Sequence, residues 1–271
     1  TRVPDTTLFR APGLGGRELV KRGVQVICFD NRDSEHSTHL SNARLPDLQA
    51  ALAGDLSSAA YTLNDMAADA IGLLDILGIE RAHVVGASMG GQIAQVMATE
   101  FPGRVLSLTS MMSTTGGRTV GQTWPEVMRE LFSRPPATTR DEFVQLYLRA
   151  QQGVGSPGYA SDESEVAATA ARAFDRSYDL AAITRQAVAT VASGDRTEQL
   201  RQLRVPAQVI HRLEDRMCDV SGGGATAEAI DGAELVLIEG MGHNLPPGLR
   251  SRIAGYIADF VWRVERNKNG A

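Results

Sequence analysis

A serine with glycines two residues to either side lies in the stretch Ala82 to Ala94, whose sequence is AHVVGASMGGQIA. A Val-rich apolar run precedes Ser88 and a helix-like alternation follows it, which predicts a tight strand-to-helix turn of the G-x-S-x-G type. Gly86 and Gly90 keep side chains away from the approach to the serine hydroxyl. The turn also aims the amide of Met89 toward the place where an attacked carbonyl oxygen would become negative.

Two phosphate-binding interpretations of this stretch do not fit the rest of the chain. A P-loop ends in Gly-Lys followed by Ser or Thr, whereas the only lysines are Lys21 and Lys268. A dehydrogenase turn of the type Gly-x-x-x-Gly-x-Gly would need glycine where Gln92 stands, and it accompanies a Tyr-x-x-x-Lys pair. None of the 5 tyrosines is followed four places on by lysine. We therefore interpret Ser88 as a candidate nucleophile.

Length and composition indicate a globular chain and argue against nucleic acid and membranes as partners. A chain of 271 residues can bury a large core. The net charge of −5 is spread over interspersed residues of both signs, which gives no electrostatic footprint for nucleic acid or a membrane surface. The apolar runs are shorter than the roughly 18 residues of a membrane span, and the beginning lacks the apolar core of a signal peptide, so we predict a cytoplasmic location. Cys28 and Cys218 are not expected to form a disulfide.

Strand and helix patterns alternate in the first part of the chain, which predicts parallel βαβ units with right-handed crossovers. A capping pattern at Thr62 opens a predicted helix that Gly78 ends, and the helix after Ser88 ends near Thr99. The residues before Gly13 are too short and broken to define a structure. Buried parallel strands are predicted at Val24–Phe29, Ala82–Val85 and Val105–Met111.

The alternation stops between Thr114 and Leu203, where helical patches are separated by Gly and Pro. Strands and helices resume afterwards and end in an amphipathic helix. We therefore divide the chain into a core of residues 1–113 and 204–271 and a helical cap of residues 114–203. The predicted cap helices are Pro125–Phe132, Asp141–Gln151, Glu163–Phe174 and Leu180–Ala192, the next strands are Ala207–His211 and Leu235–Ile238, and the terminal helix is Leu249–Val264.

Candidate acids and a candidate base follow the last two predicted strands. A serine hydroxyl needs a base to take its proton, and the base needs an acid to orient it. Such groups lie beyond the carboxyl ends of strands in open parallel sheets. Glu214 and Asp215 follow one strand, with Asp219 a little further on, and His243 follows the other. The order along the chain is thus nucleophile, acid, base.

Three separated motifs give the chain from Gly13 onward a resemblance to the α/β-hydrolases. The resemblance implies an α/β-hydrolase fold with a mostly parallel central sheet flanked by helices. It also implies a helical cap after the third recognisable strand, with the first strands of the family missing or truncated here. The motifs are Gly86–Gly91, similar to the family's elbow, Leu213–Asp215, similar to its acid loop, and Gly240–His243, similar to its histidine loop.

The same resemblance bears on individual site residues. Asp215 matches the position of the family's acid better than Glu214 or Asp219 does. The segment Pro12–Leu14 resembles a His-Gly-x loop with Pro12 in place of His, so the amide of Leu14 is expected to complete the oxyanion hole.

A second loop narrows the resemblance to a branch of the family. Asp30–Asp33 followed by Ser37 and Thr38 resembles the loop of a bacterial branch that includes the aclacinomycin methylesterases. Its usual glycines are replaced by Ser34–His36. His36 and His39 in this loop are expected to be solvated, and His83 and His211, within strands, to be packed or solvent-tipped.

The predicted function is that of a serine hydrolase that cleaves a carboxylic ester, such as a methyl ester, through an acyl-enzyme. Ser88, His243 and Asp215 would form the triad, with Met89 and Leu14 as oxyanion donors. Alternatives on this fold are a cofactor-free haloperoxidase or perhydrolase, a C–C bond hydrolase and a thioesterase, and a non-catalytic ligand-binding protein is an alternative of another class. No metal or cofactor is predicted. A small-molecule substrate is the expected partner, without nucleic acid or membrane, and a homo-oligomer stays open.

Overall fold

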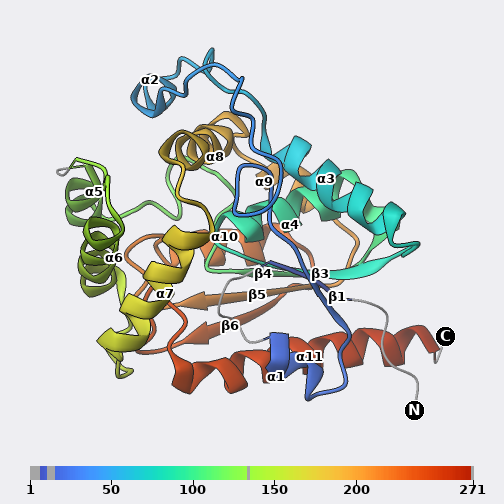
Figure 1. Ribbon diagram of the computed structural model, residues 1–271. Coiled ribbons are helices and arrows are strands. Elements are labelled where there is room, and N and C mark those ends of the chain that lie inside the picture. Colours follow the sequence, from blue (N-terminus) through green and yellow to red (C-terminus); the bar gives the residue numbers. More distant parts are fainter. Residues whose placement is uncertain (1–6, 11–15, 133–134, 270–271) are drawn as a thin grey trace.

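A parallel sheet forms the centre of the protein (Figure 1). The computed structural model describes residues 7–10, 16–132 and 135–269. Within these residues the strands are β1 (Thr7–Arg10), β2 (Val26–Cys28), β3 (Ala82–Ala87), β4 (Val105–Met111), β5 (Ala207–Arg212) and β6 (Glu234–Ile238). They form a 6-stranded sheet in the order β2-β1-β3-β4-β5-β6 with every neighbouring pair parallel. The carboxyl ends of all strands therefore lie along one edge.

Strand β1 is the main difference from the sequence-based expectation. We expected no strand before Gly13, but β1 lies between β2 and β3 and pairs with both, Thr7 being opposite Val26 and His83. Its 4 residues are too few to show a periodic pattern, and the pairing with two other strands defines them as a strand. The helical insertion consequently follows the fourth strand and not the third.

Helices cover both faces of the sheet. Helices α1 (Gly16–Val20) and α11 (Pro247–Asn269) lie on one face, and α3 (Leu63–Ile76), α4 (Met89–Glu100) and α10 (Ser221–Ala229) lie on the other (Figure 1). The two faces have separate apolar clusters, because successive side chains of a strand point to opposite faces. Val84 of β3 belongs to the cluster beside α3 and α4, and Val85 belongs to the cluster beside α11. The predicted cap of α3 is present, since the amide of Thr62 donates to Asp65 at 2.8 Å.

A helical insertion, residues 114–203, connects β4 to β5. It contains α5 (Pro125–Phe132), α6 (Arg140–Val154), α7 (Glu163–Ser177), α8 (Leu180–Ala192) and α9 (Thr197–Arg201). Figure 1 shows α6 and α7 beyond the carboxyl ends of β5 and β6. The remaining short helices are α2 (Leu48–Leu52) and η1 (Pro102–Arg104). In the part of the chain that the structure describes, no helix has the length and apolarity needed to cross a membrane.

A buried ion pair fastens the insertion to the core. Asp33, in the loop after β2, accepts two hydrogen bonds from the guanidinium of Arg185 on α8, both at 2.8 Å. Tyr61 Oη and the amide of Leu40 donate to the same carboxylate at 2.8 Å. Asp33 and Arg185 are each 3% exposed. A buried pair of this kind contributes little net free energy, but losing one partner leaves an uncompensated charge.

We therefore expect Arg185→Met to lower the free energy of unfolding by about 3–5 kcal/mol. The exposed pair of Arg140 with Asp175 supplies the matched control, and Arg140→Gln should leave stability unchanged within error. Chemical denaturation monitored by circular dichroism measures both. Equal midpoints for Arg185→Met and the wild-type protein would show that the ion pair does not fasten the insertion.

Candidate active site

Ser88 occupies a strained turn between β3 and α4. Its backbone has φ 56° and ψ −125°, a left-handed conformation that a residue with a side chain rarely adopts. The amide of Ser88 donates to the carbonyl of Met111 on β4 at 2.9 Å, which holds the turn against the sheet. A Cβ atom at position 86 would lie 2.0 Å from the carbonyl oxygen of Gly90, so only glycine fits there. The local sequence thus produces the predicted turn.

His243 connects Ser88 to Asp215. Its Nε2 lies 3.1 Å from Ser88 Oγ, and its Nδ1 lies 2.8 Å from Asp215 Oδ2 and 2.9 Å from Oδ1. Because an ionised carboxylate can only accept, the ring proton belongs on Nδ1, which donates to Asp215. Nε2 then accepts a hydrogen bond from the Ser88 hydroxyl. The three residues, predicted separately from the sequence, lie within hydrogen-bond reach of one another.

Asp215 is held as a carboxylate in a buried position. It is 1% exposed, and its Oδ1 also accepts hydrogen bonds from the amides of Met217 at 3.0 Å and Cys218 at 2.9 Å. Burial by itself would raise the pKa of Asp215, but the hydrogen bond and charge of His243, the Cys218 amide and the charge of Arg212 together hold this pKa below its ordinary value. The acid can therefore orient the imidazole without taking its proton.

The other candidate acids do not reach His243. Asp219 accepts hydrogen bonds from the amide of Ser221 at 3.0 Å and from Trp124 Nε1 at 3.3 Å. The carboxylate of Glu214, the neighbour of Asp215, likewise makes no hydrogen bond to His243 within the described residues. The sequence left this choice open because the three acids follow the same strand.

Two histidines outside the site serve packing, as expected. His83 Nδ1 lies 2.7 Å from Ser107 Oγ, and its Nε2 lies 3.0 Å from Glu265. His211 is buried in β5 with Nε2 2.8 Å from the carbonyl of Cys218. His39 lies in the loop after β2, and its Nε2 is 3.2 Å from the carbonyl oxygen of Glu35.

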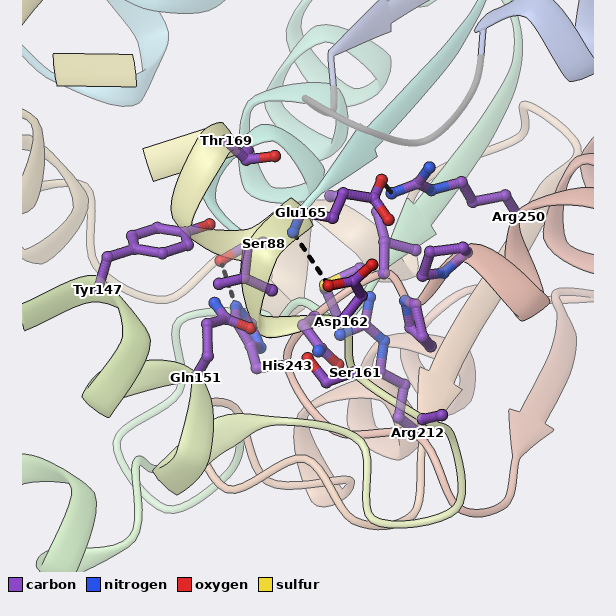
Figure 2. Close-up of a pocket in the computed structure, with 18 residues that line it drawn as sticks. Ser88, Tyr147, Gln151, Ser161, Asp162, Glu165, Thr169, Arg212, His243 and Arg250 are labelled. Carbon is purple, nitrogen blue, oxygen red and sulfur yellow. Dashed lines mark hydrogen bonds and ion pairs between the residues drawn. The ribbon is translucent and has the colours of Figure 1, made fainter. Parts of the chain in front are cut away.

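A cavity of about 280 Å³ opens over Ser88 and His243 (Figure 2). Tyr147 and Gln151, one turn apart on α6, line it together with the two candidate catalytic residues. Burial raises the pKa of Tyr147, so its hydroxyl keeps its proton and can donate a hydrogen bond. Charged residues at the beginning of α7 and of α11 also line the cavity. Among them, Arg250 Nη2 lies 3.3 Å from Glu165 Oε1. Residues of the insertion thus form much of the wall opposite the nucleophile.

The insertion also contacts the backbone of the histidine loop. The amide of His243 donates to the carbonyl of Val154 at 2.6 Å, and the amide of Gly242 donates to Ser156 Oγ at 3.0 Å. A Cβ atom at position 242 would lie 2.1 Å from the carbonyl oxygen of Gly155, so the two segments pack backbone against backbone. The end of α6 therefore helps to determine where the imidazole lies.

Of the two predicted oxyanion donors, Met89 lies among the described residues and Leu14 does not. Met89 is the first residue of α4, directly after Ser88. The first amides of a helix have no partner within the helix, so an anion is favoured there. Leu14 lies outside the described residues. The expectation that its amide completes the oxyanion hole therefore stays a prediction.

Comparisons with known proteins agree with this architecture. Residues 11–246 match the α/β-hydrolase fold family. The chain belongs to this family. Among its relatives, rhodomycin D methylesterase DnrP of Streptomyces peucetius is 27% identical over 265 residues, which cover 88% of this chain and 82% of that protein. A second rhodomycin D methylesterase, DauP of Streptomyces sp. strain C5, is also 27% identical, over 266 residues. The expected α/β-hydrolase enzyme of the ester-hydrolase type is thus supported.

Solved structures of this family share the fold. The meta-cleavage product hydrolase CumD of Pseudomonas fluorescens IP01 superposes with a TM-score of 0.70 at 18% identity, covering 95% of this chain and 90% of that chain. An enol-lactonase from Burkholderia xenovorans LB400 gives a TM-score of 0.69 at 20% identity, with 96% and 92% covered. At such identities the likeness concerns the fold only. It confirms the predicted mostly parallel sheet flanked by helices.

Several residues beside the site were not found from the sequence. Tyr147 and Gln151 were part of a predicted helix, but which face would meet Ser88 depends on how α6 packs. Arg212 carried a usable signal, because a charged residue directly follows a predicted apolar strand and precedes the acid loop. Ser156 lies in a Gly- and Pro-containing segment that reads only as a break between helices.

We expect Gly86→Ala to abolish labelling of Ser88 by a fluorophosphonate, because the added methyl group would displace the start of α4. Gly72→Ala provides the control. Nothing lies within 4 Å of a Cβ at Gly72 on α3, and alanine there should stabilise the protein by about 0.5–1 kcal/mol. Labelling rates and thermal unfolding measure both variants. Labelling of Gly86→Ala at the wild-type rate would contradict the packing described for the turn.

Proposed function

We propose that this protein is a serine hydrolase that cleaves a carboxylic ester through an acyl-enzyme. The observation that carries the proposal is the continuous chain of hydrogen bonds from Ser88 Oγ through His243 to the buried Asp215, at 3.1 Å and 2.8 Å. Each member has the property that its role requires. Ser88 stands on a turn that lines the cavity, His243 has the tautomer of a base, and Asp215 accepts from the ring and is buried from water.

The reaction then follows from the geometry. Ser88 Oγ attacks the ester carbonyl carbon while its proton passes to His243 Nε2, and Asp215 stabilises the imidazolium that forms. The carbonyl oxygen becomes an oxyanion beside the amide of Met89, with Leu14 proposed as the second donor. Collapse breaks the bond to the alcohol oxygen, which takes the proton from His243. A water molecule, deprotonated by His243, attacks the acyl-enzyme in the same way and releases the acid and the free serine.

A methyl ester is the proposed substrate type. The relatives at 27% identity are named rhodomycin D methylesterases, which supports a small alcohol as leaving group. With so small an alcohol, most of the 280 Å³ cavity would receive the acid part. We propose that residues 114–203 act as the cap, with Tyr147 and Gln151 providing polar contacts that select this part.

The mechanism predicts that Ser88→Ala and His243→Ala each lower kcat for a p-nitrophenyl ester by about 10⁴-fold or more, because neither the nucleophile nor the base has a substitute nearby. Asp215→Asn should cost roughly 10⁴-fold, since the amide favours the wrong imidazole tautomer. Glu214→Gln is the matched control, because this neighbouring acid makes no hydrogen bond to His243. Its kcat should be far higher than that of Asp215→Asn. Steady-state kinetics and labelling of Ser88 with a fluorophosphonate are the measurements.

Assays with methyl, short-acyl and thioester substrates of the native protein and Ser88→Ala separate the ester hydrolase from a thioesterase. An intact protein that turns over none of these substrates and does not label at Ser88 would refute the proposed function. A wild-type rate for His243→Ala on a verified substrate would refute the role of the histidine.

A further inference from the structure

Arg212 is a charged side chain buried beside the catalytic groups. It ends β5, is 1% exposed, and lines the same cavity as Ser88 and His243 (Figure 2). Burial lowers the pKa of Arg212 to about 9, which still leaves the guanidinium charged at neutral pH. A buried charge is costly unless neighbouring groups compensate for it. The carbonyl of Gly242 and the negative charge of Asp215 both compensate for it, and both belong to the loops of the proposed triad.

The first contact fixes the histidine loop. Arg212 Nη1 donates a hydrogen bond to the carbonyl of Gly242, the residue before His243. On the opposite side, Val154 and Ser156 of the insertion accept hydrogen bonds from the amides of His243 and Gly242. The peptide group between Gly242 and His243 is therefore held at its oxygen by Arg212 and at its nitrogen by Val154, and Ser156 holds the nitrogen of the preceding peptide. Small displacements of such a loop would move Nε2 away from Ser88.

The second contact is electrostatic. Arg212 precedes the acid loop, and its positive charge is one of the influences that hold the pKa of Asp215 below its ordinary value. The carboxylate in turn opposes the effect of burial on Arg212. In a site removed from water, such an attraction between unlike charges is screened less than at the surface.

We infer that Arg212 is a positioning residue for ester hydrolysis: it fixes the Gly242 carbonyl so that His243 faces Ser88, and it places a positive charge beside the acid loop. The inference rests on the proposed function, in which Ser88 and His243 carry the chemistry. It assigns no contact between Arg212 and the substrate.

Charge and geometry can be separated by two substitutions. Arg212→Lys keeps the charge but loses the guanidinium group whose Nη1 donates to the Gly242 carbonyl. Arg212→Met loses both. Without the positive charge, Asp215 would hold its proton up to a higher pH, and a protonated Asp215 cannot stabilise the imidazolium that forms when the serine proton is taken. The acid limb of the kcat/KM profile should therefore move to higher pH in Arg212→Met and stay in place in Arg212→Lys.

The other ionisable groups near the site are the same in all variants, so differences between pH profiles report on Arg212. On the core side these groups are His211, Cys218 and Asp219, and on the cavity side they are Tyr147, Asp162, Glu165 and Arg250.

Arg196 gives a matched control for the loss of a buried arginine. It is 4% exposed, burial lowers its pKa to about 10, and it donates to Gln92 Oε1 at 3.0 Å and to the carbonyl of Gly194 at 2.9 Å. Arg196→Met and Arg212→Met should both lower thermal stability, while the acid limb of the Arg196→Met profile stays at the wild-type pH.

The experiment measures kcat, KM and kcat/KM for p-nitrophenyl acetate over a range of pH, with active sites titrated by a fluorophosphonate. We expect kcat to fall about 100-fold in Arg212→Met and about 10-fold in Arg212→Lys, with KM changed much less, because a misplaced base slows the chemical step. Arg212→Met should also move the acid limb by about half a pH unit or more, a shift absent from Arg212→Lys and Arg196→Met.

An unshifted acid limb in Arg212→Met, with a loss of kcat no larger than that of Arg196→Met, would overturn the inference and leave Arg212 a structural residue. If Arg212→Met does not fold, Arg212→Lys decides, because a wild-type kcat in that variant would show that the contact with Gly242 does not position His243. Activity of Ser88→Ala equal to wild type would instead overturn the proposed function.

Discussion

The backbone conformation of Ser88 is the constraint on which the rest of the site depends. With φ at 56°, the serine leaves β3 and begins α4 within a single residue, and its side chain stands clear of both elements. Such a conformation is unfavourable for a residue with a Cβ, so the surroundings must enforce it. Gly86 allows the chain to approach the carbonyl of Gly90, and the bond from the Ser88 amide to Met111 ties the turn to β4. The strain is thus offset by the packing of a parallel sheet.

The parallel sheet also explains why the acid and the base meet the serine. Strands that all run in one direction release their loops at one edge, so loops from β3, β5 and β6 arrive together although they are far apart in sequence. Two buried charges of opposite sign lie at the end of β5, since Arg212 is its last residue and Asp215 comes three residues later. Each reduces the cost of burying the other, and both act on the loop that carries His243.

The helical insertion has two relations to the site. Tyr147 and Gln151 of α6 form a wall of the cavity, whereas the end of the same helix binds the backbone of Gly242 and His243. The insertion is itself fastened to the core by the buried pair of Asp33 and Arg185 on α8. A change in how the insertion sits would therefore alter both the space for a substrate and the placement of the imidazole. A wall of the cavity and the position of the His243 imidazole are thus linked through α6.

Local patterns in the sequence determined the elements and the order of the candidate groups. The turn at Ser88, most buried strands and the helices of residues 114–203 follow from periodicity, glycine and proline positions and caps, which act over a few residues. Tertiary structure alone decided which acid reaches His243, that β1 joins the sheet, and that Arg212 lies against Gly242. Ser88 and His243 are 155 residues apart, and their distance of 3.1 Å depends on the packing of every element between them. Such contacts leave no periodic trace in the sequence, because they are set by three-dimensional packing and not by neighbours along the chain.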